Sequence, residues 1–132
     1  MIIGGGLTGC EIALDLFRKG KHPAIIEMKD DLIAVKNMCL ANTSYLRDCF
    51  KTNEVPVYLN AGVKNISATE VTVESKDQGI VTLPADSVIM SVGYHPIPLT
   101  KAGKNIHLLG DCKKVGNVRS VIWGAWDIAM KI

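Results

Sequence analysis

The sequence predicts an α/β fold, in which helices cover a central parallel sheet and an antiparallel β-meander is added to it. Three observations predict this class. Short apolar runs alternate with segments of helical period over residues 1–59. Short segments rich in β-branched residues, separated by polar turns, follow over residues 63–83. A hydrophobic content of 48% with only 5% aromatic residues indicates an aliphatic interior, which is typical of a buried parallel sheet.

The first predicted elements form a strand, a glycine turn, a helix and a second strand. The apolar residues 1–3 run into three glycines at residues 4–6. Apolar side chains at helical spacing then predict a helix from about Leu7 to near Gly20. Residues 24–26 form the next apolar run, and a carboxylate, Glu27, follows it. This order is that of a βαβ unit.

The next part of the chain continues the parallel sheet. Residues 28–41 show no clear period and are left unassigned. The spacing of the apolar side chains predicts a helix from Asn42 or Thr43 to about Asn53, and residues 55–59 read as a third strand.

The later segments change in character. We expect antiparallel strands at residues 63–67, 71–74 and 80–83, with polar turns between them at residues 68–70 and 76–79. Residues 87–92 read as a buried strand that ends at Gly93. Beyond it we expect a short strand at residues 105–109 and a last helix, whose apolar positions are Val121, Ile122, Ala125, Ile128 and Ala129.

Composition narrows the classes of partner. The 15 Lys+Arg and 13 Asp+Glu give a net charge of +2 without a block of either sign, so we expect no nucleic acid and no membrane partner. No apolar stretch reaches the roughly 18 residues of a membrane-spanning helix. The four cysteines lie far apart, which favours reduced thiols and a cytoplasmic location over disulfides or a metal site. Because the first strand begins so abruptly, we expect the chain to be part of a longer protein.

The glycines carry the functional signal. Gly4, Gly6 and Gly9 form the pattern G-x-G-x-x-G between a strand and a helix. In a Rossmann-like dinucleotide fold the first glycine permits the tight turn, the second lets pyrophosphate approach the backbone, and the third lets helix and strand pack closely. The N–H groups of the first helical residues, Leu7 and Thr8, would face the phosphates. We therefore expect a three-layer, Rossmann-like domain with a dinucleotide cofactor.

Glu27 supplies the second half of this signature. A carboxylate at the end of the second strand can accept hydrogen bonds from the adenosine ribose hydroxyls. It would repel the 2′-phosphate of NADP(H), and Lys29 is the only cation close to it in the sequence. The pattern favours NAD(H) over NADP(H). FAD can use the same glycines and the same carboxylate, so these residues leave the two dinucleotides open.

Three segments together resemble a known family. The run IIGGGLTGCE at residues 2–11 is similar to the opening of the NAD(P)H domain of the pyridine nucleotide-disulfide oxidoreductases. The run SVGYHP at residues 91–96 resembles the Gly-x-x-Pro segment that closes this domain. The run LLGDC at residues 108–112 resembles the Gly-Asp motif at which the chain re-enters the FAD domain. The whole chain most resembles the C-terminal part of the NADH:flavin oxidoreductases, which include 2,4-dienoyl-CoA reductase and the enoate reductases.

The resemblance implies hydride transfer from NADH to FAD, and in the parent protein reduction of an enoyl or dienoyl substrate. It implies an NAD(H)-binding domain at residues 1–104 and a segment of an FAD domain at residues 105–132. The remaining FAD and FMN domains would be further partners.

The resemblance also implies roles for single residues. Glu11 resembles a glutamate near the nicotinamide, or is an acid of the first helical turn. Gly93 belongs to the closing segment. Asp111 resembles an FAD-contacting residue, or is a turn aspartate.

The sequence assembles no catalytic or metal-binding constellation. His22, His95 and His107 are isolated, and Cys10 reads as a small packing residue beside the glycines. Cofactors perform hydride transfer, so such a domain needs no acid or nucleophile of its own. We expect it to be inactive alone, which leaves its status as an enzyme uncertain.

Several alternatives stay open. An FAD-binding unit and a non-catalytic nucleotide-sensing domain both accommodate the glycines. A methyltransferase shares the glycine loop and the acidic strand end, but the meander and the Gly-Asp ending do not suit it. Trp123 and Trp126 on the last helix can pack in the core, or face another domain or the partner of a homodimer.

Overall fold

The structure is a computed structural model that describes residues 1–34, 39–76 and 78–132. The described residues form two compact units, 1–93 and 94–132. The functional boundary expected between residues 104 and 105 is a different division and stays a prediction.

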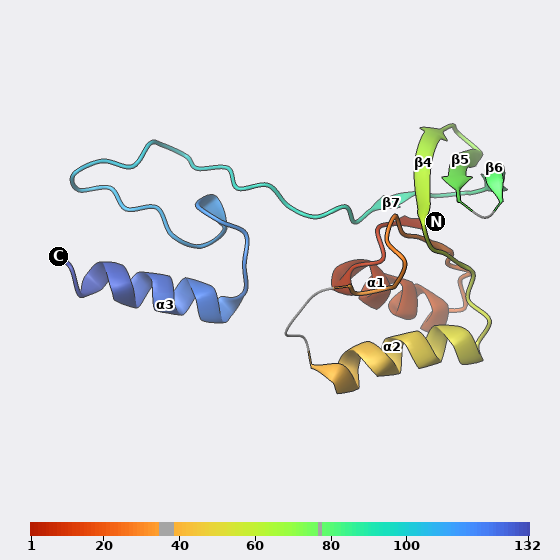
Figure 1. The fold of residues 1–132 in the computed structure, drawn as a ribbon, viewed down its shortest axis with the longest axis horizontal. Coiled ribbons are helices and arrows are strands. Elements are labelled where there is room, and N and C mark those ends of the chain that lie inside the picture. The colour runs from red at the N-terminus through yellow and green to blue at the C-terminus, as the bar shows by residue number, and fades with distance from the viewer. Residues whose placement is uncertain (35–38, 77) are drawn as a thin grey trace. The chain divides into compact units, whose positions relative to one another are not determined.

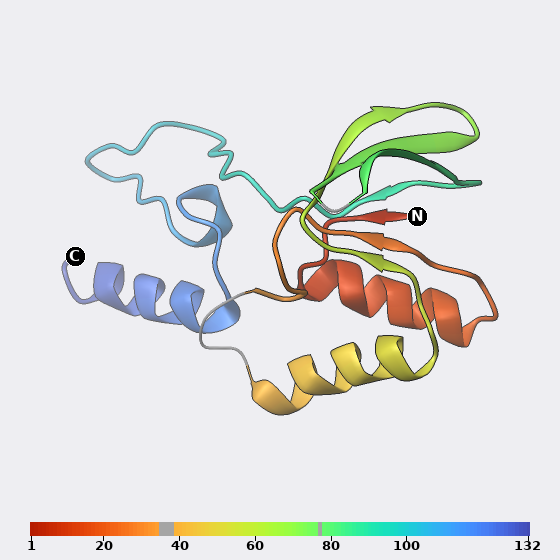
Figure 2. The same ribbon diagram turned by 45° about the vertical axis from the view of Figure 1, so that its right-hand side comes forward.

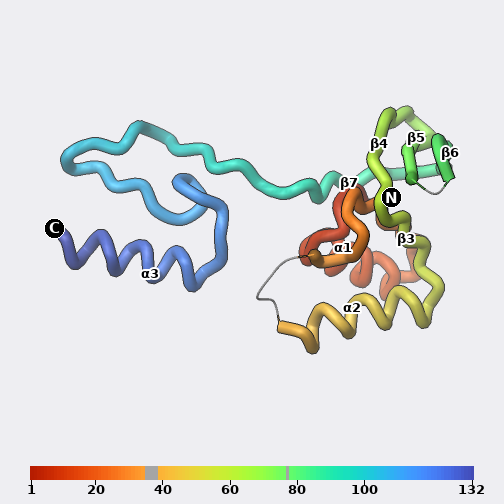
Figure 3. The backbone as a smooth tube through the Cα atoms, viewed as in Figure 1, coloured from red at the N-terminus to blue at the C-terminus, as the bar shows by residue number. Residues whose placement is uncertain are grey.

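A four-stranded parallel sheet forms the middle of the first unit (Figure 1). Every neighbouring pair of its strands runs parallel, so the carboxyl ends of all the strands lie along one edge. The backbone trace shows the chain passing from this sheet through the helix α1 (Leu7–Arg18) and back (Figure 3). In spatial order β3-β2-β1-β7, the strands are β3 (Val57–Tyr58), β2 (Ile25–Ile26), β1 (Ile2–Ile3) and β7 (Ile89–Met90).

Two helices, α1 (Leu7–Arg18) and α2 (Leu40–Thr52), cover one face of this sheet (Figure 2). They form one hydrophobic core with the strands, in which Phe50 is only 2% exposed. The second helix begins slightly earlier than the predicted Asn42 or Thr43, because Cys39 already has the extended backbone of an N-cap residue. Residues 35–38, within the segment that the sequence left unassigned, lie outside the described residues.

The antiparallel meander lies on the opposite face of the sheet (Figure 2). Its strands are β4 (Ala61–Ile66), β5 (Glu70–Ser75) and β6 (Gly79–Pro84), in the order β4-β5-β6. Successive strand residues point to opposite faces, so Ile25 belongs to the core with the helices and Ile26 to the core with the meander. The α/β fold with a parallel and an antiparallel sheet is thus confirmed. Asp77, in the turn expected between β5 and β6, lies outside the described residues.

The last strand of the parallel sheet differs from the prediction. A buried strand was expected over residues 87–92, but only Ile89–Met90 is a strand, and Met90 is 59% exposed. The reason is its position: β7 pairs with β1 at the edge of the sheet, where it has a neighbour on one side only.

The second unit contains a short 3₁₀ helix, Gly110–Cys112, and the helix α3 (Val118–Ala129). A capping box begins α3, in which the side chains of Asn117 and Ser120 accept each other's backbone N–H groups. The prediction of a strand at residues 105–109 is wrong. Ile106 instead pairs back with Gly103 in an isolated bridge, and no strand beside this segment is found in the described part of the second unit.

The apolar face of α3 is exposed. Trp123 and Trp126 are 57% and 59% exposed, and no residue of this helix is buried. The alternative that these tryptophans pack in a core is therefore wrong for this chain. Over the described ranges, we find no helix long and apolar enough to cross a membrane.

Candidate dinucleotide-binding site

Gly4 closes the glycine turn against two neighbouring strands. Its N–H donates to the carbonyl of Ile26 at 2.8 Å. Its backbone has φ +105°, a value that residues with a side chain rarely adopt. A Cβ atom there would also overlap the carbonyl oxygen of Ser91. Glycine is thus required here by both backbone conformation and contact.

Gly9 and Gly6 differ in their surroundings. A Cβ atom at Gly9 would overlap the carbonyl oxygen of Gly4, so only glycine lets α1 pack this closely on the turn. At Gly6 a Cβ would have no atom within 4 Å. The backbone of Gly6 can therefore be approached from outside, as the pyrophosphate of a dinucleotide requires.

The N-terminus of α1 faces the same opening. Gly6 is the N-cap residue of this helix, and no side chain caps it among the described residues. Leu7 and Thr8 begin the first turn, where backbone N–H groups have no partner within the helix. A helix end of this kind, with its positive dipole end, is suited to phosphate.

Glu27 leaves β2 at the same edge and points to the turn. Its Oε2 accepts the N–H of Gly5 at 2.6 Å, and its Oε1 accepts the N–H of Lys29 at 2.9 Å. A carboxylate offers about four acceptor positions, so further donors can still be bound. The structure thus brings together the predicted residues Gly4, Gly6, Leu7, Thr8, Gly9 and Glu27.

The position of this site follows from the sheet topology. From β1 the chain moves to β2 on one side, whereas β7 lies on the other side of β1. In open parallel sheets, ligands bind outside the carboxyl ends of the strands, at the point where the strand order reverses. The glycine turn lies at this point.

Several further residues of the site lie outside the G-x-G-x-x-G spacing. Gly5 is buried, and a Cβ atom there would lie 2.5 Å from Cδ2 of Leu32. Ile33 donates its N–H to the carbonyl of Gly5 at 2.7 Å. Arg47, on α2, bonds to the same loop. The run of three glycines indicates that Gly5 belongs to the turn. No spacing rule, however, connects Arg47 to a loop so far from it in the sequence.

Cys10 is a fully buried thiol beside the turn. It donates to the carbonyl of Gly5 at 3.4 Å, and its exposed fraction is 0%. Burial, with a smaller effect from Glu27, raises the pKa of the Cys10 thiol to about 12. It stays protonated near neutral pH, in agreement with the packing role and not with a reactive thiolate.

The remaining predicted residues lie elsewhere. Glu11 is exposed in the second turn of α1, so the alternative of a first-turn acid is wrong. Gly93 follows β7 with φ +95°. Asp111 belongs to the second unit, where its Oδ1 accepts the N–H of Gly116 at 3.1 Å. Of the described His, Cys, Asp and Glu side chains, no three converge on a position for a metal ion.

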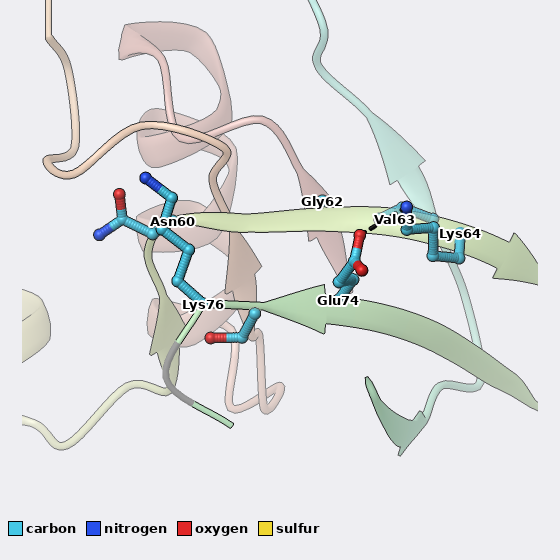
Figure 4. Close-up of a pocket in the computed structure, with 7 residues that line it drawn as sticks. Asn60, Gly62, Val63, Lys64, Glu74 and Lys76 are labelled. Carbon is cyan, nitrogen blue, oxygen red and sulfur yellow. Dashed lines mark ion pairs between the residues drawn. The ribbon is translucent and has the colours of Figure 1, made fainter. Parts of the chain in front are cut away.

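A shallow depression of about 380 Å³ lies on the meander and includes no residue of the glycine turn (Figure 4). It is crossed by the ion pair between Lys64 and Glu74, whose Nζ and Oε2 atoms are 2.5 Å apart. No helix N-terminus lines this depression, and neither the glycine turn nor Glu27 belongs to it, so we place the candidate site at the turn. The residues that line the depression are Asn60, Gly62, Val63, Lys64, Glu74, Ser75 and Lys76.

A comparison with protein families agrees with this geometry. The family model described as pyridine nucleotide-disulphide oxidoreductase matches residues 1–120. The chain belongs to this family. The domain is of the type found in flavin-dependent oxidoreductases, which use FAD and a nicotinamide dinucleotide.

Individual relatives are much longer than this chain. Cinnamate reductase of Clostridium sporogenes is 34% identical over 145 residues, which cover 100% of this chain and 21% of the relative. NADH oxidase of Thermoanaerobacter brockii is 25% identical over 138 residues, again 100% of this chain and 21% of the relative. A structure of 2-naphthoyl-CoA reductase has a TM-score of 0.82 at 20% identity and covers 99% of this chain and 20% of that one. The chain thus spans about a fifth of the length of each of these three relatives.

Proposed function

We propose that the first unit binds NAD(H) and presents it to a flavin held by other parts of a larger oxidoreductase. The observation that carries this proposal is the hydrogen bond of 2.6 Å between Glu27 and Gly5 at the carboxyl ends of β1 and β2. It joins a carboxylate suited to ribose hydroxyls to a turn suited to phosphate, which supports a dinucleotide site here.

The glycine turn fits a dinucleotide. The positions of Gly4 and Gly9 have no room for a Cβ atom, while the backbone of Gly6 is open. The pyrophosphate would lie on Gly6 and on the N–H groups of Leu7 and Thr8, and Glu27 would accept hydrogen bonds from the adenosine ribose. When bound, the nicotinamide ring supplies the hydride. The chain's own residues bind and orient it.

Glu27 also supports a preference for NAD(H) over NADP(H). A 2′-phosphate would meet the carboxylate that already accepts two backbone N–H groups. The nearest cation in sequence, Lys29, has its Nζ 3.5 Å from the carbonyl oxygen of Ala34. The guanidinium of Arg47 is paired with Asp31. Neither cation is directed at Glu27 in a way that would offset the repulsion.

The finer assignment concerns the parent protein. The resemblance to the NADH:flavin oxidoreductases, with cinnamate reductase among the relatives, supports reduction of an enoyl or dienoyl substrate at a site outside this chain. Glu11 would lie towards the nicotinamide and Gly93 would close the domain. Asp111 would contact FAD, and residues 105–132 would then belong to the flavin domain. Alone, the chain would bind NAD(H) without turnover.

Titration of the purified chain tests this proposal. NADH fluorescence should change on binding, with a lower Kd than for NADPH, and the chain should not oxidise NADH by itself. The FAD-binding alternative predicts a yellow protein with flavin absorbance. A colourless chain that binds NADH would exclude that alternative, and a chain that binds neither dinucleotide would exclude the proposal. If joining the chain to the flavin-binding part of the parent protein gives no NADH oxidation, the nucleotide-sensing alternative is favoured.

A further inference from the structure

An ion pair connects α2 to the loop that follows β2. Arg47 donates from Nε to Oδ1 of Asp31 at 3.0 Å and from Nη2 to Oδ2 at 2.8 Å. The same Nη2 donates to the carbonyl of Leu32 at 2.5 Å. This is the bidentate geometry in which a guanidinium fixes a carboxylate, with an added bond to the backbone.

The loop that Arg47 holds lies directly on the glycine turn. Leu32 is 5% exposed and packs where a side chain at Gly5 would have to lie. Both backbone groups of Gly5 are bound from this side: its N–H by Glu27, and its carbonyl by the N–H of Ile33 at 2.7 Å. Residues 27–33 therefore set the position of the middle glycine.

The backbone of this loop is unfavourable by itself. Ile33 has φ +51°, although it is β-branched and only 2% exposed. Such a residue in the left-handed region persists only where surrounding contacts hold it. Arg47 on one side and Gly5 on the other supply these contacts.

We propose that Arg47 is a positioning residue for the adenosine half of the cofactor. It acts through Asp31 and Leu32, which keep residues 27–33 on the glycine turn, so that Glu27 and the turn have their binding geometry before the cofactor arrives. This inference rests on the proposed NAD(H) function. Without these bonds, a smaller fraction of the chains would have the loop in its binding position. The apparent Kd would rise in inverse proportion to that fraction.

The test uses the full chain, four variants of the ion pair and one control variant. Arg47→Met removes the three hydrogen bonds and keeps an apolar stem, and Arg47→Lys keeps the charge without the bidentate geometry. Asp31→Asn and the double variant R47M/D31N probe the partner. The matched control is Arg18→Met: this exposed arginine on α1 donates to Tyr45 Oη at 2.9 Å and makes no side-chain hydrogen bond to residues 27–33. Circular dichroism establishes whether each variant is folded. If Arg47→Met does not fold, Arg47→Lys takes its place in the binding measurements.

The expected result is a common loss of affinity. Arg47→Met and Asp31→Asn should each raise the Kd for NADH and for ADP-ribose about tenfold, and the double variant no further. Arg18→Met should leave both values unchanged. The inference is overturned if Arg47→Met binds like the wild type. It is also overturned if Asp31→Asn retains full affinity while Arg47→Met loses it, since the pairing with Asp31 would then not hold the loop for binding.

Amide hydrogen exchange in the ligand-free chain separates this inference from the proposed function. The N–H of Ile33, bonded to Gly5, should exchange about tenfold faster in Arg47→Met than in Arg18→Met. If the wild type binds neither NADH nor ADP-ribose, the proposed function fails and the positioning role fails with it. Unchanged exchange at Ile33, with NADH binding intact, overturns the positioning role alone.

Discussion

The carboxylate of Glu27 and the backbone N–H of Gly5 are 2.6 Å apart, although 22 residues separate them in the chain. The bond joins the end of β2 to the turn after β1. It orients Glu27 across the carboxyl ends of the strands instead of leaving it extended in solvent. The acceptor proposed for the ribose is thus already oriented in the ligand-free chain.

Replacement of Glu27 should change both affinity and selectivity. Glu27→Gln keeps the size of the side chain but removes its charge, and hydrogen bonds to charged groups contribute about 1.5–3 kcal/mol each. We expect NADH to bind about tenfold more weakly, and the ratio of the NADPH and NADH dissociation constants to move towards one. Fluorescence titrations with both nucleotides measure this. Asp15→Asn, which removes a surface carboxylate paired with Lys19, is the control. An unchanged ratio would contradict the assignment of Glu27.

Two alanine variants should separate folding from binding in the glycine turn. Gly4→Ala forces a side chain into φ +105° and against the carbonyl of Ser91, so the free energy of unfolding should fall by about 2 kcal/mol or more. Gly6→Ala meets no neighbouring atom, and the free energy of unfolding should change by less than about 1 kcal/mol.

Urea unfolding followed by circular dichroism measures both stabilities, and NADH titration of Gly6→Ala completes the test. The new methyl group would lie where the pyrophosphate approaches, so Gly6→Ala should bind NADH more weakly while remaining as stable as the wild type. Wild-type affinity in Gly6→Ala would place the pyrophosphate elsewhere.

These glycines and Glu27 could be placed from the sequence because their signal is local. Each follows directly from the order of strand, turn and helix, and the parallel sheet then brings the strand ends together. The contacts of Arg47 could not be placed in this way. They depend on how α2 packs and on the path of a loop without any period, and neither is encoded in a short spacing.

The Cys10 thiol gives a prediction for alkaline pH. In the unfolded chain its pKa is near the ordinary value of 9.0, and in the folded chain it is about 12. Between these values the unfolded chain binds fewer protons, so the stability of the fold should decrease as the pH rises from 9 towards 12. Below pH 9 this contribution is constant.

Cys10→Ala removes that titration, so its unfolding free energy should depend less steeply on alkaline pH than that of the wild type. Denaturant unfolding at pH 8, 9 and 10 measures the two slopes. Equal slopes would show that Cys10 ionises as readily in the folded as in the unfolded chain. The exposed Cys39, changed to Ala, is the control.

The core between the sheet and α2 depends on Phe50. Phe50→Ala should lower the free energy of unfolding by about 3–5 kcal/mol, because a side chain with 2% exposure leaves a cavity. Leu40→Ala, on the same helix but 77% exposed, should change it by less than about 0.5 kcal/mol. Urea unfolding measures both variants. A small effect of Phe50→Ala would mean that α2 does not pack as described.

The second half of the chain was harder to predict for a physical reason. A short, largely apolar run such as residues 105–109 becomes a strand only where another strand offers hydrogen bonds, and local sequence does not contain that partner. The exposure of Met90, Trp123 and Trp126 was not predicted for the same reason: local sequence does not contain the neighbours that would cover them. Apolar residues indicate that a surface can be buried, and only the tertiary arrangement decides whether it is.

The pairing of β1 bears on the order in which the molecule is built. One neighbour, β2, is reached within the first 26 residues, but the other, β7, begins only at Ile89. During synthesis, the βαβ unit can therefore form long before the carbonyl of Ser91 arrives beside Gly4. The wall of the glycine turn is complete only once Ser91 has been added, so a nascent chain acquires the whole of the proposed nucleotide site only after the meander has been synthesised.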